Sequence, residues 1–284
     1  MAAVPVPIPD GYGPPVVIGG AAGSGTRVGA ALLDELGFYI GFDTNKALDN
    51  LAYTFLLKRP RWYERRSTRQ RRFDAGARPF VRSMTTGGRP PARELVTLAG
   101  AWYSTTRRGH DRLGRRRRRW ATRMVRLIVN SEGHDPSRHA GWAWKEPATL
   151  MLLPELVEAF PQMRFIHIVR DPERLARRQT QTIEMVLNWS QNFGLRPPQE
   201  GEDSYAATLE FLRLVTERAE RVGRARLGER YHQLDIDLLC EQPEPQLDAL
   251  LAFLGVEVDP ETRERLLAIP DPGRLAAPGP APRP

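Results

Sequence analysis

A glycine-rich loop near the start of the chain limits the possible folds more than any other feature. Residues 16–18 form a β-branched, apolar run, and residues 19–25, which follow it, are all glycine, alanine or serine. Apolar residues then recur at helical spacing over residues 26–36, and Gly37 ends this pattern as a glycine commonly ends a helix. A buried strand, a glycine loop and a helix in this order are typical of α/β folds.

Strand-like and helix-like segments alternate along the rest of the chain. Short runs without charge, one of them rich in β-branched residues, predict strands at residues 142–144 and 165–169, and a late strand is expected at residues 231–236. Helical patterns cover residues 45–57, 62–73, 92–106, 112–130, 149–160, 172–187, 205–226, 246–254 and 261–267. The alternation predicts an α/β fold of the P-loop nucleotide-binding type, in which helices flank a central parallel sheet and a basic, helical insertion covers about residues 47–130.

Three side chains of these segments are expected to have structural roles. Trp142 and Trp144 alternate along one predicted strand and face the same side, which favours core packing over base stacking. His167 lies between isoleucines in another predicted strand, so we expect a buried histidine with a hydrogen-bond partner. Asp237 is expected to cap a helix rather than to act in catalysis.

Length and composition are those of one soluble globular domain. The chain has 284 residues, of which 41% are hydrophobic and 27% charged. We expect residues 15–269 to form the domain, residues 1–14 a flexible leader and residues 270–284 a mobile, Pro-rich tail. The start has no apolar signal core and no apolar run reaches the roughly 18 residues of a membrane span, so the expected location is cytoplasmic. Cys240 is the only cysteine, which excludes an internal disulfide and a thiolate metal cluster.

The glycine loop predicts a phosphate-binding site. Unpaired backbone N–H groups and the positive end of a helix meet there, and both favour an anion. Gly20 and Gly25 have the Walker-type spacing, but Thr26 and Arg27 stand where a nucleotide hydrolase has Lys and Ser or Thr. Because those two residues hold the β,γ-phosphates and Mg²⁺, their absence argues against ATP or GTP hydrolysis.

Four motifs, taken in order, resemble those of the PAPS-dependent sulfotransferases of bacterial type (PAPS is 3′-phosphoadenosine 5′-phosphosulfate). They are the loop at residues 20–27, Trp-Ala-Trp-Lys-Glu-Pro at residues 142–147, Ile-His-Ile-Val-Arg-Asp-Pro at residues 166–172, and Leu-Leu-Ala-Phe-Leu-Gly-Val at residues 250–256. The resemblance covers about residues 16–274. It implies an enzyme that transfers a sulfuryl group from PAPS, its co-substrate, to a hydroxyl or amine of an acceptor without a metal ion.

The resemblance also implies which residues bind the 5′ end of the donor. The matching loop residues are Gly23, Ser24, Gly25, Thr26 and Arg27, whose amides and hydroxyls would hold the 5′-phosphate. The family usually has Arg or Lys where Gly23 stands. Arg27, or an arginine of the basic insertion, is therefore expected to supply the missing cation.

Further matches concern the 3′-phosphate. Arg170 matches the arginine that binds it at the end of a strand. Eight residues later this chain has Arg178 where the family has a serine, so Arg178 would add a second cation, or Thr180 or Thr182 would take the role of the serine. Arg274 matches a C-terminal Gly-Arg pair that covers the nucleotide in some bacterial members.

Lys145 matches the lysine that contacts the transferring sulfuryl group. A fixed cation at that place stabilises the negative charge that develops on the leaving oxygen. The acceptor also has to lose a proton, for which the candidates are Asp49, Glu146, Asp43 and His110. The resemblance favours Asp49 and then Asp43. Glu146 is next to Lys145 in the sequence, so the alternative to a role as base is that it only forms an ion pair with Lys145.

One segment of the chain is strongly basic, and it allows more than one interpretation of the function. Residues 58–126 contain 22 basic and 4 acidic residues, and residues 115–119 are all arginine. Arg107, Arg108, Arg112 and this run would bind an anionic acceptor or product, or else form a solvated surface. The alternatives to sulfuryl transfer are a kinase-like P-loop phosphotransferase and a non-catalytic module that binds polyanions, although a nucleic acid is not the expected partner.

Overall fold

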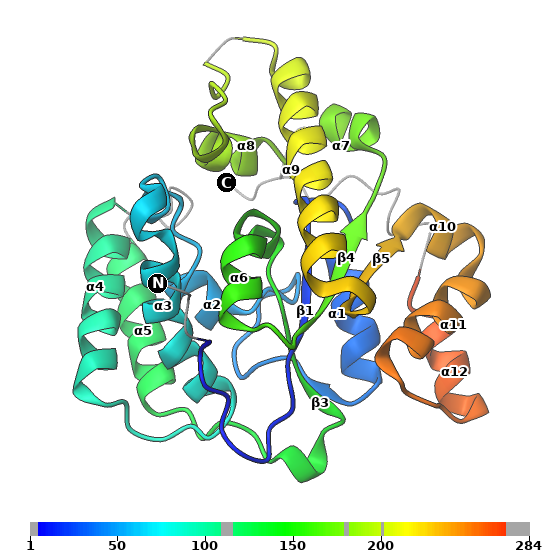
Figure 1. Ribbon diagram of the computed structural model, residues 1–284, viewed down its shortest axis with the longest axis horizontal. Coiled ribbons are helices and arrows are strands. Elements are labelled where there is room, and N and C mark those ends of the chain that lie inside the picture. Colours follow the sequence, from blue (N-terminus) through cyan, green and yellow to red (C-terminus); the bar gives the residue numbers. More distant parts are fainter. Residues whose placement is uncertain (1–4, 109–115, 179–181, 200–201, 271–284) are drawn as a thin grey trace.

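The computed structural model describes residues 5–108, 116–178, 182–199 and 202–270. Within these ranges the chain forms a five-stranded sheet in the order β2-β3-β1-β4-β5 (Figure 1). The strands are β1 (Val16–Gly20), β2 (Phe38–Tyr39), β3 (Gly141–Lys145), β4 (Arg164–Val169) and β5 (Tyr231–Asp235). Each pairs in parallel with its neighbour, which confirms the predicted α/β fold.

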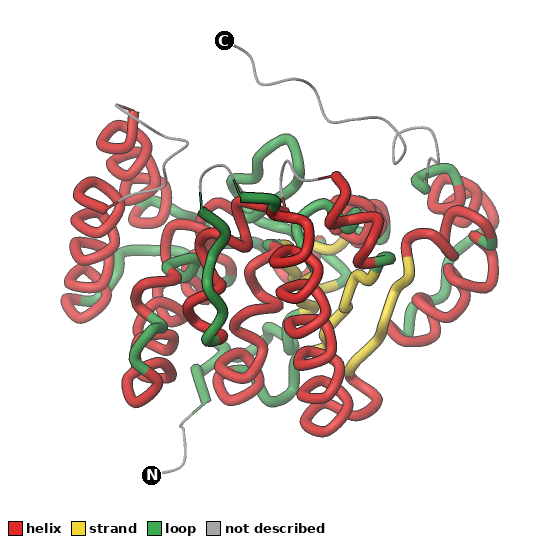
Figure 2. The backbone as a smooth tube through the Cα atoms, turned by 90° about the horizontal axis from the view of Figure 1, so that it is seen from above, coloured by secondary structure: helices red, strands yellow, loops and turns green. Residues whose placement is uncertain are grey.

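Helices cover both faces of the sheet, so that the strands lie between two helical layers (Figure 2). They are α1 (Thr26–Glu35), α2 (Leu51–Leu56), α3 (Arg69–Met84), α4 (Ala92–Arg108), α5 (Arg117–Val129), α6 (Leu153–Ala159), α7 (Pro172–Arg178), α8 (Thr182–Trp189), α9 (Ser204–Leu227), α10 (Ile236–Glu241), α11 (Pro243–Leu254) and α12 (Pro260–Leu267). None of the helices in the described ranges is both long and apolar enough to cross a membrane.

The alternation of side chains along each strand divides the core into two parts. Val17 and Trp144 point to one face and pack with helices α2 to α6, α8 and α9. Ile18 and Ile168 point to the other face and pack with α1 and α10 to α12. Trp142 and Trp144 are each at most 1% exposed, as predicted for core residues.

Several element boundaries differ from the sequence-based expectation. The predicted helix at residues 45–57 is only α2, because residues 45–50 form a loop in which Leu48 has φ 60°. The helix predicted at residues 62–73 is α3, which begins seven residues later and extends to Met84. Strand β2 was not predicted, since two residues are too few to give a pattern and are ordered by pairing with β3.

Two residues in the described part of the expected leader contact the domain. Val6 is 3% exposed, and its N–H donates to the carbonyl of Ala159 at 2.9 Å. The Tyr12 hydroxyl donates to the carbonyl of His134 at 2.8 Å. Val6 and Tyr12 therefore attach this segment to the domain. Residues 271–284 of the expected tail lie outside the described ranges.

His167, in the middle of β4, makes the stability of the fold sensitive to acid. It is 1% exposed, its Nδ1 lies 2.6 Å from the Tyr231 hydroxyl, and burial lowers its pKa to about 4. An unfolded histidine has a pKa of about 6.5, so between these two values the unfolded chain binds a proton that the folded chain excludes. Stability is therefore lost as the pH falls through this window, by about 2 kcal/mol between pH 7 and pH 5.

We expect His167→Gln to remove that part of the pH dependence, because glutamine does not titrate. Urea unfolding at pH 7 and pH 5 measures the difference for the wild type and the variant. His139→Gln, at a histidine outside the sheet, is the control. The same loss of stability in His167→Gln as in the wild type would assign the acid sensitivity to other groups.

Candidate functional site

The residues singled out by the sequence gather at the carboxyl edge of the sheet. In the strand register, Ile18 of β1 lies opposite Lys145, the last residue of β3. Gly20, which begins the glycine loop, lies opposite Ile168, two residues before Arg170. Because the strands are parallel, the segments that leave them meet at the same edge, where ligands commonly bind in open α/β sheets.

The glycine loop has a backbone that requires its glycines. Gly23 and Gly25 have φ of 88° and 96°, in the left-handed region that residues with a side chain rarely adopt. A Cβ on Gly20 would lie 2.7 Å from the carbonyl oxygen of Ile168, so the loop also passes close to β4. Gly25 precedes α1 and provides no side-chain cap, which leaves the first N–H groups of this helix available to an anion.

The side chains of this loop differ in exposure. Ser24 is 1% exposed, and its Oγ has no hydrogen-bond partner among the described residues. Thr26 is buried at the start of α1, whereas Arg27 is exposed on the first turn. The loop is held from outside by Thr182, whose hydroxyl donates to the carbonyl of Ala22 at 3.0 Å. Thr182, the alternative to Arg178, thus supports the loop backbone.

Arg170 follows β4 and presents a buried guanidinium at the same edge. Its side chain is 1% exposed. Nε donates to Oδ1 of Asp237 at 3.2 Å, and Nη2 lies 3.2 Å from the same oxygen, but neither Nη1 nor Nη2 makes a hydrogen bond to a described residue. Arg174 contacts this oxygen at 3.0 Å from the exposed side. Arg170 therefore retains N–H donors for a further anion.

Asp237 was predicted as a helix cap, and this is wrong. The N-cap of α10 is Asp235, whose carboxylate accepts from the N–H groups of Asp237 and Leu238. Asp237 lies two residues after this cap, and its side chain reaches Arg170 and Arg174. Arg274 and the side chain of Arg178 lie outside the described part of the chain.

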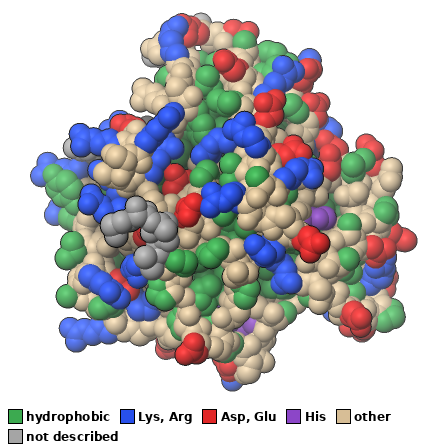
Figure 3. Space-filling view, in the orientation of Figure 1, with side chains coloured by type: hydrophobic (Ala, Val, Ile, Leu, Met, Phe, Trp, Pro, Cys, Tyr) green, Lys and Arg blue, Asp and Glu red, His purple; other side chains and the backbone are tan. Residues whose placement is uncertain are grey.

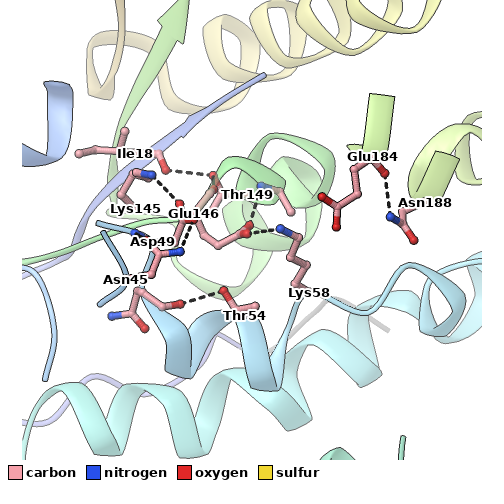
Figure 4. Close-up of polar contacts among 12 residues, drawn as sticks. Ile18, Asn45, Asp49, Thr54, Lys58, Lys145, Glu146, Thr149, Glu184 and Asn188 are labelled. Atoms are coloured by element: carbon pink, nitrogen blue, oxygen red, sulfur yellow. Dashed lines mark hydrogen bonds and ion pairs between the residues drawn. The ribbon is translucent and has the colours of Figure 1, made fainter. Parts of the chain in front are cut away.

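Lys145 and Asp49 form a short ion pair at the end of β3 (Figure 4). Nζ of Lys145 lies 2.5 Å from Oδ1 of Asp49, and the two side chains are 2% and 19% exposed. Burial lowers the pKa of Lys145, and the neighbouring Asp49 carboxylate opposes that shift. The loop before α2 thus places a carboxylate directly on the lysine that the sequence singled out.

Asn45 fixes the second oxygen of Asp49, a role that the sequence analysis missed. Its amide donates to Oδ2 of Asp49 at 2.8 Å, while its own Oδ1 accepts from the N–H groups of Ala47 and Asp49 at 2.8 and 3.0 Å. Leu48 adopts its left-handed conformation inside this turn. Because a helix was predicted over this segment, the turn was not recognised. An Asn at the start of a polar segment is nevertheless a known turn signal.

The other candidate bases have partners of their own. Glu146 is 0% exposed, its Oε2 accepts from the N–H of Ala148 at 2.6 Å, and its Oε1 lies 2.7 Å from Nζ of Lys58. Burial raises the pKa of Glu146. Asp43 binds the guanidinium of Arg123, on α5, through both oxygens at 2.7 and 2.9 Å. Candidate His110 lies outside the described ranges.

Exposed arginines in α5 and at its N-cap lie on the same side of the molecule as α4, which packs against α5. Arg116, Arg118, Arg119 and Arg126 are exposed, and none contacts a carboxylate among the described residues. Figure 3 shows basic side chains along this side. Arg123 connects the group to the site through Asp43. Arg112 and Arg115, and the side chain of Arg108, lie outside the described part.

Three solved structures that are similar to this chain are sulfotransferases or sulfotransferase domains. The chain is similar to the sulfotransferase STF1 of Mycobacterium tuberculosis H37Rv, with 14% identity and a TM-score of 0.41 over 90% of this chain and 71% of that one. It is also similar to the sulfotransferase domain of the Synechococcus PCC 7002 olefin synthase, with 17% identity and a TM-score of 0.40 over 95% and 85%. The sulfotransferase STF9 of Mycobacterium avium shares 15% identity, with a TM-score of 0.43 over 89% and 66%. No curated protein matches.

The assignment itself depends on the family model. The model described as the sulfotransferase family matches residues 14–260, a range that includes the glycine loop, Asp49, Lys145 and Arg170. This range is most of the chain, and it contains the whole parallel sheet. The family model thus covers both the parallel sheet and the residues at its carboxyl edge, and the chain belongs to the sulfotransferase family.

Proposed function

We propose that the protein transfers a sulfuryl group from PAPS to a hydroxyl or amine of an acceptor. The observation that carries this proposal is Arg170, a guanidinium with a 1% exposed side chain and two nitrogens without a hydrogen-bond partner among the described residues. Buried donors without partners are unfavourable, and a phosphate group is one of the anions that a guanidinium binds with two parallel hydrogen bonds. A nucleotide with a phosphate away from its 5′ end would satisfy them.

The residues of the edge fit such a donor. Ser24, whose buried Oγ lacks a partner among the described residues, and the uncapped N–H groups at the start of α1 would hold the 5′-phosphate. Arg170 would bind the 3′-phosphate, with Asp237 fixing the orientation of its guanidinium. Arg27, exposed on the first turn, is available for the position where the family usually has a cation.

Lys145 and Asp49 would carry the chemistry. PAPS supplies the activated sulfuryl group and, as the S–O bond breaks, a leaving phosphate oxygen that gains negative charge. The ammonium of Lys145 would stabilise that charge, and it is already fixed and largely removed from water. Asp49 orients the ammonium and would accept the proton of the acceptor, because it is the partly exposed carboxylate in contact with Lys145. Glu146 is fully buried, and Asp43 pairs with Arg123 instead of Lys145.

The acceptor that we propose is anionic. Support comes from three exposed arginines of α5 that have no carboxylate partner among the described residues, Arg118, Arg119 and Arg126. Further support comes from the pairing of Arg123, on the same helix, with Asp43 in the segment that leads to Asp49. A positive surface next to a reaction centre raises the local concentration of anionic molecules.

Melting temperatures in the presence of nucleotides test the proposed function. Adenosine 3′,5′-bisphosphate at about 100 times its Kd should stabilise the protein by about 2.7 kcal/mol, which is a rise in Tm of about 5–10 °C for a domain of this size. ATP with Mg²⁺ at the same concentration should give a much smaller rise, because it has no 3′-phosphate. A larger rise with ATP would instead favour the kinase-like phosphotransferase.

A further inference from the structure

Two ion pairs connect the two ends of α2 to consecutive residues at the end of β3. Asp49 precedes α2 and pairs with Lys145, while Lys58 follows α2 and pairs with Glu146 at 2.7 Å. In Figure 4 the two pairs lie side by side, with Lys145 and Glu146 pointing in different directions from the same strand end. The backbone adds a third connection, since the N–H of Asn50 donates to the carbonyl of Lys145 at 2.8 Å.

The ion pair with Lys58 provides the positive charge that the buried Glu146 carboxylate needs. Glu146 is fully buried, whereas the Lys58 side chain is 29% exposed and can be hydrated in part. A buried carboxylate without a cation is strongly destabilised, so Glu146 holds Lys58 in place more firmly than a surface pair would. Glu146 also accepts from the N–H of Ala148 and thereby caps the 3₁₀ helix at Pro147–Leu152.

The use of lysine at these two positions also sets the cluster apart from the rest of the chain. Of the 42 basic residues only Lys46, Lys58 and Lys145 are lysines, and two of these three belong to this cluster. The charged groups around Lys145 are Asp49, Glu146 and Lys58. Glu184, on α8, faces Lys58 from the other side (Figure 4) and adds a further negative charge to the cluster.

We propose that Lys58 is a positioning residue: by pairing with Glu146 it fixes the C-terminal end of α2 on the end of β3, and so keeps Asp49, at the other end of α2, on the ammonium of Lys145. The catalytic meaning of this arrangement rests on the proposed function of Lys145. The arrangement itself rests only on the two ion pairs and the short helix between them.

The small number of lysines allows a direct test. In protein labelled with ¹³C at the lysine ε-carbon, three signals report the titration of Lys46, Lys58 and Lys145. The decisive variant is Lys58→Met/Glu146→Gln, which removes one positive and one negative charge and leaves no buried charge without a partner. Lys46→Met is the matched control, since Lys46 is exposed and lies in the loop of Asp49.

The expected result is a fall in the pKa of Lys145 in the double variant. The effects of the removed Lys58 cation and the removed Glu146 anion on this pKa nearly cancel. If nothing else changed, the pKa of Lys145 would therefore stay almost constant. Loss of the Asp49 contact, by contrast, lowers the pKa of a buried lysine by about 1–3 units. Lys58→Arg, which keeps the cation, and Lys46→Met should both leave the Lys145 titration unchanged.

A pKa of Lys145 that stays constant or rises in the double variant overturns the proposal. Should that variant fail to fold, Lys58→Gln gives the same decision, because glutamine can still donate a hydrogen bond to Glu146. Removal of the cation raises the pKa of Lys145, or leaves it nearly unchanged where Glu146 takes up a proton, whereas displacement of Asp49 lowers it. Binding of adenosine 3′,5′-bisphosphate to the wild type is measured separately. Its absence would refute the proposed function without affecting the conclusion on Lys58.

Discussion

Lys145→Met should lower kcat for sulfuryl transfer by about 10²–10³, with little change in the affinity for adenosine 3′,5′-bisphosphate. A preorganised charge that acts on the leaving group stabilises the transition state more than the bound donor, and removal of one such donor typically costs this much. Methionine keeps the length and apolar stem of the side chain. Asp49, which is 19% exposed, can be hydrated after the loss of its partner.

Release of adenosine 3′,5′-bisphosphate from PAPS measures the rate, and equilibrium titration measures the affinity. Lys46→Met is the matched control, because it removes an exposed lysine three residues before Asp49. It should leave both quantities unchanged. If Lys145→Met weakens nucleotide binding as much as it lowers kcat, Lys145 binds the ground state, and its proposed role is wrong.

Arg170→Ala should weaken binding of adenosine 3′,5′-bisphosphate about ten- to a hundredfold. A charge-assisted contact between arginine and phosphate contributes about 1.5–3 kcal/mol. Two Arg170 nitrogens have no hydrogen-bond partner among the described residues, so the contact would be formed in full on binding. The fold should survive, because Asp237 keeps its contact with Arg174.

Two controls separate this role from a general effect of charge. Adenosine 5′-phosphate lacks the 3′ group, so its weaker binding should be the same in Arg170→Ala and in the wild type. Arg174→Ala removes the other arginine on Asp237, whose side chain is 48% exposed, and should change the affinity for the bisphosphate only slightly. Equal losses for both nucleotides, or for both variants, would contradict the assignment of Arg170 to the 3′-phosphate.

Local sequence patterns predicted most of the strands, loops and helices around the site. The strand at residues 16–18, the glycine loop and the first helix were placed within about two residues, because apolar periodicity and glycine act over a few neighbouring residues. The same holds for β4 and for the position of Arg170 directly after it. From these elements and their order, a parallel sheet with a phosphate loop and a cation at one edge could be predicted.

The loop that carries Asp49 could not be predicted in this way. Residues 45–57 have a helical pattern, yet the chain forms a turn first, in which Asn45 bonds Asp49 and Asn50 caps α2. The N–H of Asn50 donates to Lys145, which is 95 residues away in sequence, and this contact with β3 helps to hold the segment out of a helix. Helix propensity is a weak preference, and tertiary contacts overrule it.

The sequence by itself determined most of the elements, their order and the edge at which the chemistry lies, because these follow from short-range periodicity and from the geometry of parallel strands. Only the tertiary structure decided which charges meet. Lys145 and Glu146 are neighbours in the chain but point to different partners, Asp49 and Lys58, and Asp237 binds Arg170 instead of capping a helix. Ion pairs between distant segments depend on where whole elements pack, and that is set by the core as a unit rather than by any local pattern.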